Sequence, residues 1–120
     1  MNLINDLRAI VGADGVLDAD EVAGRQAGIW RRDRLVARAL VRPSSTEDVA
    51  AVLRYGHAHR QPVVTHGGLT GLVHGADAAP DQLILSLERM RAIERVDPVQ
   101  RVAVAQAGVT LQAVQEAAEA

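Results

Sequence analysis

A glycine-rich stretch over residues 62–76 contains the residues whose types and spacing are most suited to chemistry. It reads Pro-Val-Val-Thr-His-Gly-Gly-Leu-Thr-Gly-Leu-Val-His-Gly-Ala, with Gly67, Gly68, Gly71 and Gly75. Glycine permits positive φ angles and lets another group approach the main chain closely. Successive N–H groups in such a loop can converge on an anion. The stretch therefore predicts an anion-binding loop, and a glycine-rich connection without a ligand is the alternative on spacing alone.

The loop matches neither of the two common phosphate-binding motifs. A P-loop requires a Lys, and the sequence contains none. The dinucleotide motif G-x-G-x-x-G is not met either, because Gly68 and Gly71 give only G-x-x-G. The apolar pair Val63-Val64 before the loop predicts a buried strand. The loop would then follow the carboxyl end of a strand, where open α/β sheets usually bind ligands.

The residues before the loop predict a strand, a helix and a second strand. Residues 37–41 are an apolar run that stops at Pro43, which cannot donate to a strand ladder. Ser45 is placed to cap a helix over residues 46–60 by accepting from the N–H of Asp48. With a strand at 63–65, this is a βαβ unit with parallel strands. The expected buried stripe of the helix is Val49, Val52, Leu53 and Gly56.

Shorter elements are expected on both sides of this unit. Residues 2–11 predict an amphipathic helix that Gly12 ends, and residues 22–36 have no readable pattern. After the loop, residues 83–87 predict a strand. Residues 93–96 and 102–106 predict an antiparallel hairpin that turns at Asp97-Pro98. Thr110 is placed to cap a last helix, whose apolar face is Leu111, Val114 and Ala118.

The composition excludes several classes of protein. A formal charge of −2 and a pI near 6.0 give no electrostatic case for binding nucleic acid. The absence of Cys excludes a disulfide framework and a thiolate nucleophile. The N-terminus does not have the pattern of a signal peptide, and no apolar run approaches the ~18 residues of a membrane span. We therefore expect a cytoplasmic protein.

No catalytic or metal-binding residue can be assigned from the sequence. The serines lack a G-x-S-x-G context, and Asp18, Asp20 and Glu21 do not meet the EF-hand pattern. His57 and His59 are two residues apart, so they do not share a helix face and make a poor metal pair. His66 and His74 flank the glycine loop, where each is a candidate for contact with a bound anion.

Four segments of the sequence, taken in their order along the chain, resemble those of a known family. They are Arg42 to Val49, the glycine loop, Leu83 to Met90, and Val104 to Val109. The order resembles the flavin domain of the FAD-linked oxidases, the vanillyl-alcohol-oxidase or PCMH-type superfamily. Within it the chain is most similar to the branch of D-lactate dehydrogenase, the glycolate oxidase flavin subunit and D-2-hydroxyglutarate dehydrogenase. The resemblance runs from about residue 37 to the end.

The resemblance implies an α+β PCMH-type FAD-binding domain and assigns cofactor-binding residues. The glycine loop would wrap the diphosphate of FAD, and two later blocks would lie along the rest of the cofactor. Leu69 and His74 stand where Gly is usual in the family. Some branches link flavin covalently through a loop His, but at the position that Leu69 occupies here. The implied contacts are His66, Gly67, Gly68, Leu69, Thr70, Gly71, Leu72, Gly75, Ala76, Met90, Ala107 and Gly108.

The resemblance also implies an incomplete domain. Residues 1–36 would be a helical lead-in, and residues 37–120 the first part of the flavin domain, truncated at its C-terminus. In the family a D-2-hydroxy acid is oxidised by hydride transfer to flavin N5, with the substrate bound by a later domain. The fragment is not expected to be active alone, and its uncovered apolar surface is expected to promote self-association. The alternative is a non-catalytic small α/β module that binds an anion or a partner.

Overall fold

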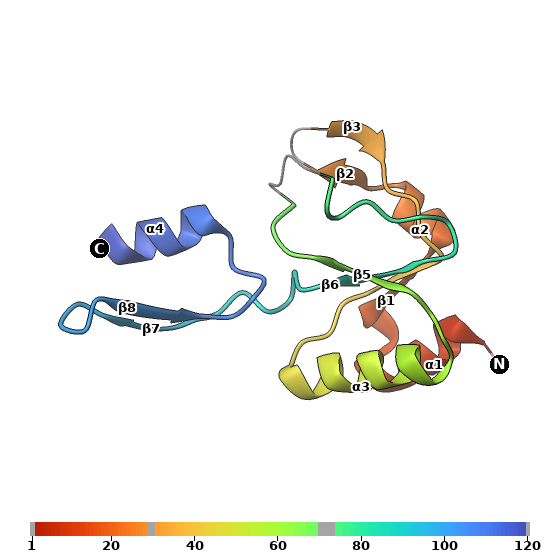
Figure 1. Ribbon diagram of the computed structural model, residues 1–120, viewed down its shortest axis with the longest axis horizontal. Coiled ribbons are helices and arrows are strands. Elements are labelled where there is room, and N and C mark those ends of the chain that lie inside the picture. The colour runs from red at the N-terminus through yellow and green to blue at the C-terminus, as the bar shows by residue number, and fades with distance from the viewer. Residues whose placement is uncertain (1, 29–30, 70–73, 120) are drawn as a thin grey trace.

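The computed structural model describes residues 2–28, 31–69 and 74–119, which form an α+β fold (Figure 1). A four-stranded sheet in the order β1-β4-β6-β5 is its centre. Two two-stranded sheets, β2-β3 and β7-β8, flank it. The elements are α1 (Leu3–Val11), η1 (Ala13–Gly15), β1 (Val16–Asp18), α2 (Ala19–Ala23), β2 (Gln26–Gly28), β3 (Arg31–Arg34), β4 (Ala39–Val41), α3 (Thr46–Ala58), β5 (Val63–His66), β6 (Leu83–Ser86), β7 (Ile93–Asp97), β8 (Val102–Ala105) and α4 (Leu111–Glu119).

The expected βαβ unit is present, with a third strand inserted into it. Ser45 caps α3 by accepting from the N–H of Asp48 at 3.1 Å, as the sequence predicted. Strands β4 and β5 do not pair with each other, because each pairs in parallel with β6, which lies between them. The carboxyl ends of three parallel strands therefore meet at one edge of the sheet. Neighbouring strands pair Val41 and Thr65 with Leu85, and His66 with Ser86.

The segment before residue 37 is not helical throughout. It begins with α1, which Asn2 caps and Gly12 ends at φ 91°, close to the expected helix. It also contains three strands, and β1 pairs antiparallel with β4 at the edge of the main sheet. Asp18 caps the short helix α2 in a capping box with Glu21, so these acids serve helix formation. The domain boundary at residue 37 stays a prediction.

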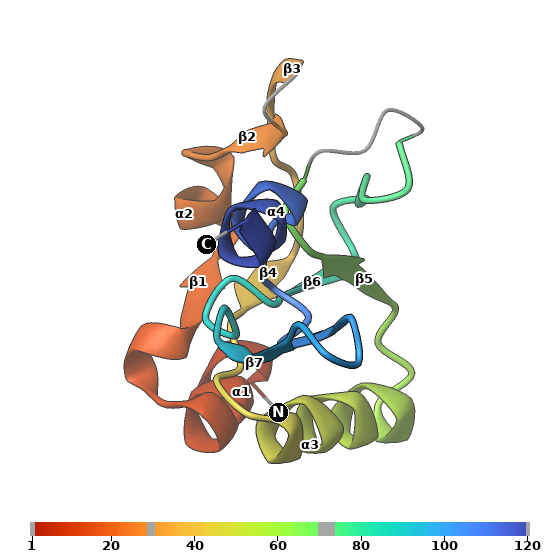
Figure 2. The same cartoon turned by 90° about the vertical axis from the view of Figure 1, so that its left-hand side faces the viewer.

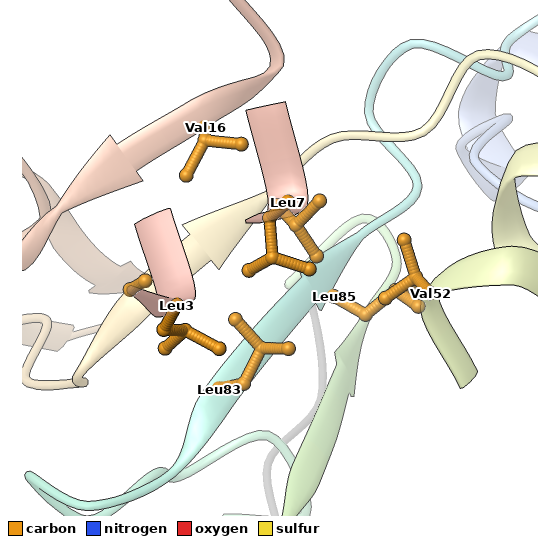
Figure 3. Packing of buried hydrophobic residues seen from close by; sticks show 8 residues of the cluster. Leu3, Leu7, Val16, Val52, Leu83 and Leu85 are labelled. Carbon is orange, nitrogen blue, oxygen red and sulfur yellow. The ribbon is translucent and has the colours of Figure 1, made fainter. Parts of the chain in front are cut away.

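Two separate hydrophobic clusters bury the two faces of the main sheet. Strand residues alternate between faces, so β4 and β6 each contribute to both. On one face α1 and α3 cover the sheet (Figures 1 and 2), and Figure 3 shows Leu3 and Leu7 of α1 and Val52 of α3 packed on Leu83 and Leu85. On the other face the buried residues are Val22, Leu35, Ala37, Leu40 and Ile84. The sheet is thus anchored on both sides, which fixes its carboxyl edge.

Two details of the expected burial are wrong. Leu53 was expected in the buried stripe of α3 but is 46% exposed, because the helix contacts the sheet through Val52 and Gly56. Val63 and Val64 were expected to be a buried strand but are only half-buried. Among the described strands, β5 is at the edge of the sheet and pairs with β6 alone, whereas the central β6 is buried along its whole length.

The hairpin β7-β8 and helix α4 form a separate lobe, which stands to the left of the sheet in Figure 1. The hairpin has the expected antiparallel pairing, and Asp97 accepts from the N–H groups of Val99 and Gln100 in its turn. Thr110 caps α4 as expected, accepting from Ala113 at 3.2 Å. No described residue of α4 is buried, and Leu111 is 72% exposed. The radius of gyration is 15.5 Å, whereas a compact domain of this length has about 14 Å.

Candidate functional site

The candidate site lies at the carboxyl edge of the parallel strands β4, β6 and β5. Arg42 follows β4, Glu88 follows β6 by two residues, and His66 ends β5 beside Ser86. Open sheets bind ligands at such an edge because the loops that leave the strands converge there. The glycine loop leaves β5 at this edge, as the sequence predicted.

The described part of the glycine loop is open where a ligand would approach. A Cβ built on Gly67 or on Gly75 would meet no atom within 4 Å. A Cβ on Gly68 would lie 3.5 Å from the methyl group of Thr110, the residue that caps α4. The loop therefore lies beside the N-terminus of α4, where helix amides favour negative charge. Thr70, Gly71 and Leu72 lie outside the described residues.

The backbone angles contradict our expectation that the loop glycines adopt positive φ. We expected the glycines to supply positive φ, but among the described glycines only Gly12 has it. In the loop the positive angles belong to Leu69, at 57°, and His74, at 62°. These are the two positions at which the family resemblance led us to expect Gly. The described glycines Gly67 and Gly75 thus supply open space, and a left-handed backbone is imposed on two residues with side chains.

The two loop histidines have different surroundings. The ring of His66 is 1% exposed, and its Nε2 lies 2.8 Å from the carbonyl oxygen of Ala76. Burial lowers the pKa of His66, and the nearby Arg25 adds to this, although the Ala76 carbonyl acts in the opposite direction. His74 is exposed, and its Nδ1 lies 3.1 Å from a carboxylate oxygen of Asp77. The His66 side chain is therefore used within the fold, and its expected contact with a cofactor stays a prediction.

Met90 and Gly108, both expected to bind cofactor, are brought together by the structure. Met90 is 7% exposed, and its carbonyl accepts from the N–H of Gly108 at 2.9 Å. A Cβ on Gly108 would lie 1.8 Å from the carbonyl oxygen of Leu87, so only glycine fits there. Ala107 is exposed. This contact joins the turn before β7 to the turn before α4, and so attaches the second lobe to the sheet.

A cluster of charged side chains lies at the same edge, and no local sequence pattern predicts it. Arg25 donates to both carboxylate oxygens of Glu88, at 2.6 and 3.4 Å, and Ser86 donates to one of them at 3.0 Å. Arg42 lies 3.9 Å from Glu88 and donates to the backbone carbonyl of Asp14. Burial alone would raise the pKa of Glu88, but the hydrogen bonds from Arg25 and Ser86 outweigh it, so the pKa lies below its ordinary value. Arg25, Arg42 and Glu88 are 17 to 63 positions apart in the chain, beyond the reach of any local motif.

The described residues of this edge are suited to holding an anionic group. Within residues 2–28, 31–69 and 74–119, no three His, Asp or Glu side chains are grouped to hold a metal ion. The same part of the chain has no helix that is both long and apolar enough to cross a membrane. The carboxyl edge of the sheet combines an open glycine loop, the N-terminus of α4 and the charged cluster around Glu88.

Comparison with known proteins agrees with these features. Residues 37–120 match a family described as FAD binding domain. The chain is 45% identical over 80 residues to D-2-hydroxyglutarate dehydrogenase of Xanthomonas citri pv. viticola, covering 67% of this chain and 17% of that protein. It is 42% identical over 79 residues to D-lactate dehydrogenase of Archaeoglobus fulgidus, covering 66% and 18%. The chain thus spans less than a fifth of the length of either relative.

A solved structure shows the same fold. The crystal structure of p-cresol methylhydroxylase with bound substrate superposes with a TM-score of 0.72, covering 97% of this chain and 24% of that one. The two sequences are 23% identical, so the likeness concerns the fold alone. The expectation of an α+β PCMH-type fold, present in part, is confirmed.

Proposed function

This chain belongs to the FAD-binding domain family, in the branch of D-2-hydroxyglutarate and D-lactate dehydrogenases, and from that premise we propose that its glycine loop holds the diphosphate of FAD. FAD is the cofactor of the family. The observation that carries the proposal is the open space at Gly67 and Gly75, where a Cβ would meet nothing. A phosphate can approach the main chain there without displacing a side chain.

Two further features fit a diphosphate. The loop lies against Thr110 at the N-terminus of α4, a nine-residue helix whose dipole favours an anion. Leu69 and His74 already have the positive φ that the loop requires, so they bend the chain as Gly would. We propose that Met90, Ala107 and Gly108 border the rest of the cofactor. The family match favours this function over a non-catalytic binding module.

For the whole flavoprotein we propose oxidation of a D-2-hydroxy acid. The relatives named above are dehydrogenases of such acids, which supports this substrate class. FAD, when bound, would supply the hydride acceptor, N5, for oxidation of the substrate carbon. The described residues bind and orient the cofactor, and none is placed as a general base. The substrate would be bound by residues beyond those of this chain.

Substitution of Gly67 tests the loop. Valine at Gly67 would fill the space proposed for the diphosphate, yet it would meet no protein atom at its Cβ. We expect Gly67→Val to weaken FAD binding roughly a hundredfold, or about 3 kcal/mol, which is the upper range of overpacking costs. Far-UV circular dichroism and the unfolding midpoint should stay unchanged. FAD affinity is measured by quenching of flavin fluorescence.

Gly67→Ala is the graded control, because one methyl group fills less of the same space. We expect its affinity to lie between those of the wild type and the valine variant. Wild-type affinity in the folded valine variant would refute the placement of the diphosphate.

A further inference from the structure

The ring of His66 connects the two ends of the glycine loop. His66 is the last residue of β5, and its Nε2 lies 2.8 Å from the carbonyl oxygen of Ala76, ten residues later. Its own carbonyl accepts from the N–H of Leu87 at 3.0 Å, so the residue is held by the sheet. Through its hydrogen bond, the ring links Ala76 to β5. Gly67 and Gly75, the two open glycines, are the immediate neighbours of the tied residues.

The geometry defines the protonation state of the ring. A carbonyl oxygen only accepts, so Nε2 must carry the proton and donate. The ring is 1% exposed, and burial disfavours a second proton on Nδ1. The charged groups that act on it are Arg25, Glu88 and Asp77, and burial outweighs the two acids. Nε2 therefore carries a proton in this arrangement, and the lowered pKa favours the neutral imidazole near pH 7.

A buried, neutral ring cannot contribute charge to a bound phosphate. It can determine how far apart the two ends of the loop lie, because a hydrogen bond of 2.8 Å leaves little freedom between residue 66 and residue 76. The open space at Gly67 and Gly75 belongs to residues next to these ends, so its spacing depends on this bond. Without the donor, the Ala76 carbonyl would lose this partner, and the Gly75 end of the loop would lose its hydrogen bond to β5.

We propose that His66 is a positioning residue that sets the spacing of Gly67 and Gly75 through its hydrogen bond to Ala76, and that its side chain does not touch FAD. This inference rests on the proposed function of the loop. It replaces the expectation that the His66 ring contacts the diphosphate. It requires a donor at the ε position of the side chain and does not require an imidazole.

Two substitutions, made in the full chain, test whether position 66 needs a hydrogen-bond donor or an imidazole ring. His66→Gln places an amide N–H donor at a similar reach, whereas His66→Leu fills the volume without a donor. We expect the leucine variant to bind FAD about tenfold more weakly, the factor that one lost buried hydrogen bond typically gives. The glutamine variant should bind within threefold of the wild type. In the absence of FAD, hydrogen exchange of peptides containing Gly75 and Ala76 should be about tenfold faster in the leucine variant alone.

The outcomes also distinguish this inference from the proposed function. Equal affinities of the leucine variant and the wild type, or equal weakening in both variants, would overturn the positioning role. If the wild type does not bind FAD but the leucine variant still exchanges faster at Gly75 and Ala76, the proposed function is wrong. The hydrogen bond from His66 to Ala76 would then still be shown to hold this end of the loop. Should the leucine variant not fold, the wild type still gives a test by ¹⁵N NMR of the ring. An Nδ1–H tautomer, or a ring that titrates at its ordinary pKa, would overturn the inference.

Discussion

Replacement of Gly108 by alanine should detach the second lobe from the sheet. The added Cβ would lie 1.8 Å from the carbonyl oxygen of Leu87, 2.7 Å from its carbonyl carbon and 2.8 Å from the Met90 oxygen. An ordinary carbon–oxygen contact is about 3.3 Å or longer. All three atoms belong to the backbone, so no side-chain rotation relieves the clash. The two turns must separate by about 1.5 Å, which breaks the 2.9 Å hydrogen bond from Gly108 to Met90.

The steric clash and the broken hydrogen bond both lower the free energy of unfolding. Overpacking costs about 1–3 kcal/mol, and a buried backbone group left without its partner costs about 1–3 kcal/mol. We expect the free energy of unfolding to fall by about 3 kcal/mol, which lowers the melting temperature by about 12 °C in a chain of this length. Thermal and urea unfolding of purified Gly108→Ala and wild-type chains measure this. Exchange of the Gly108 amide should also become much faster.

Gly24→Ala is the matched control. A Cβ on Gly24 would lie 3.4 Å from the carbonyl oxygen of Glu21, an ordinary contact, and its φ of −78° suits alanine. We expect this variant to unfold within about 0.5 kcal/mol of the wild type. A Gly108→Ala chain that is as stable as the Gly24→Ala chain would refute the steric reasoning and the attachment it implies.

Two further predictions concern stability and pH. Tyr55→Phe removes the 2.7 Å hydrogen bond to Asp6 that ties α3 to α1, and should cost about 1 kcal/mol of unfolding free energy in urea titrations. Burial and the Asp6 carboxylate raise the pKa of Tyr55 to about 12, so absorbance of the chain's single Tyr should change near pH 12; a midpoint at 10 would contradict the contact. Glu88 has a lowered pKa, so its contribution is present above pH 4.5 and is lost as the pH falls through the folded value. The loss of unfolding free energy on acidification below pH 4.5 should be smaller in Glu88→Gln, and an identical pH profile would mean that the Arg25 contact adds nothing.

Local chemistry made several elements predictable from the sequence. The caps at Ser45 and Thr110 and the turn at Asp97 depend on side chains that bond to N–H groups two or three residues away. The carboxyl-edge position of the glycine loop followed from a strand that precedes it. These features require no knowledge of distant contacts, and the structure confirms them.

What the sequence could not show depends on contacts between distant residues. The insertion of β6 between β4 and β5 is not encoded by any local pattern. The three-residue strand β1 is defined only by its partner β4. The need for glycine at position 108 arises from the backbone of Leu87, and the hydrogen bond of the His66 ring depends on the carbonyl of Ala76, ten residues later. The residues proposed to contact FAD came from a family resemblance, and they stay a prediction.

The central position of β6 affects the order in which the chain can fold during synthesis. Strand β5 leaves the ribosome about 20 residues before β6, yet within the described part of the chain β6 is the only strand that pairs with it. At about 5–20 residues per second, β5 waits roughly one to four seconds without a hydrogen-bonded neighbour. During this interval α1, β1 and β4 can associate, but the glycine loop has no fixed strand to leave from. A nascent chain halted between β5 and β6 would therefore present an unpaired strand edge to chaperones.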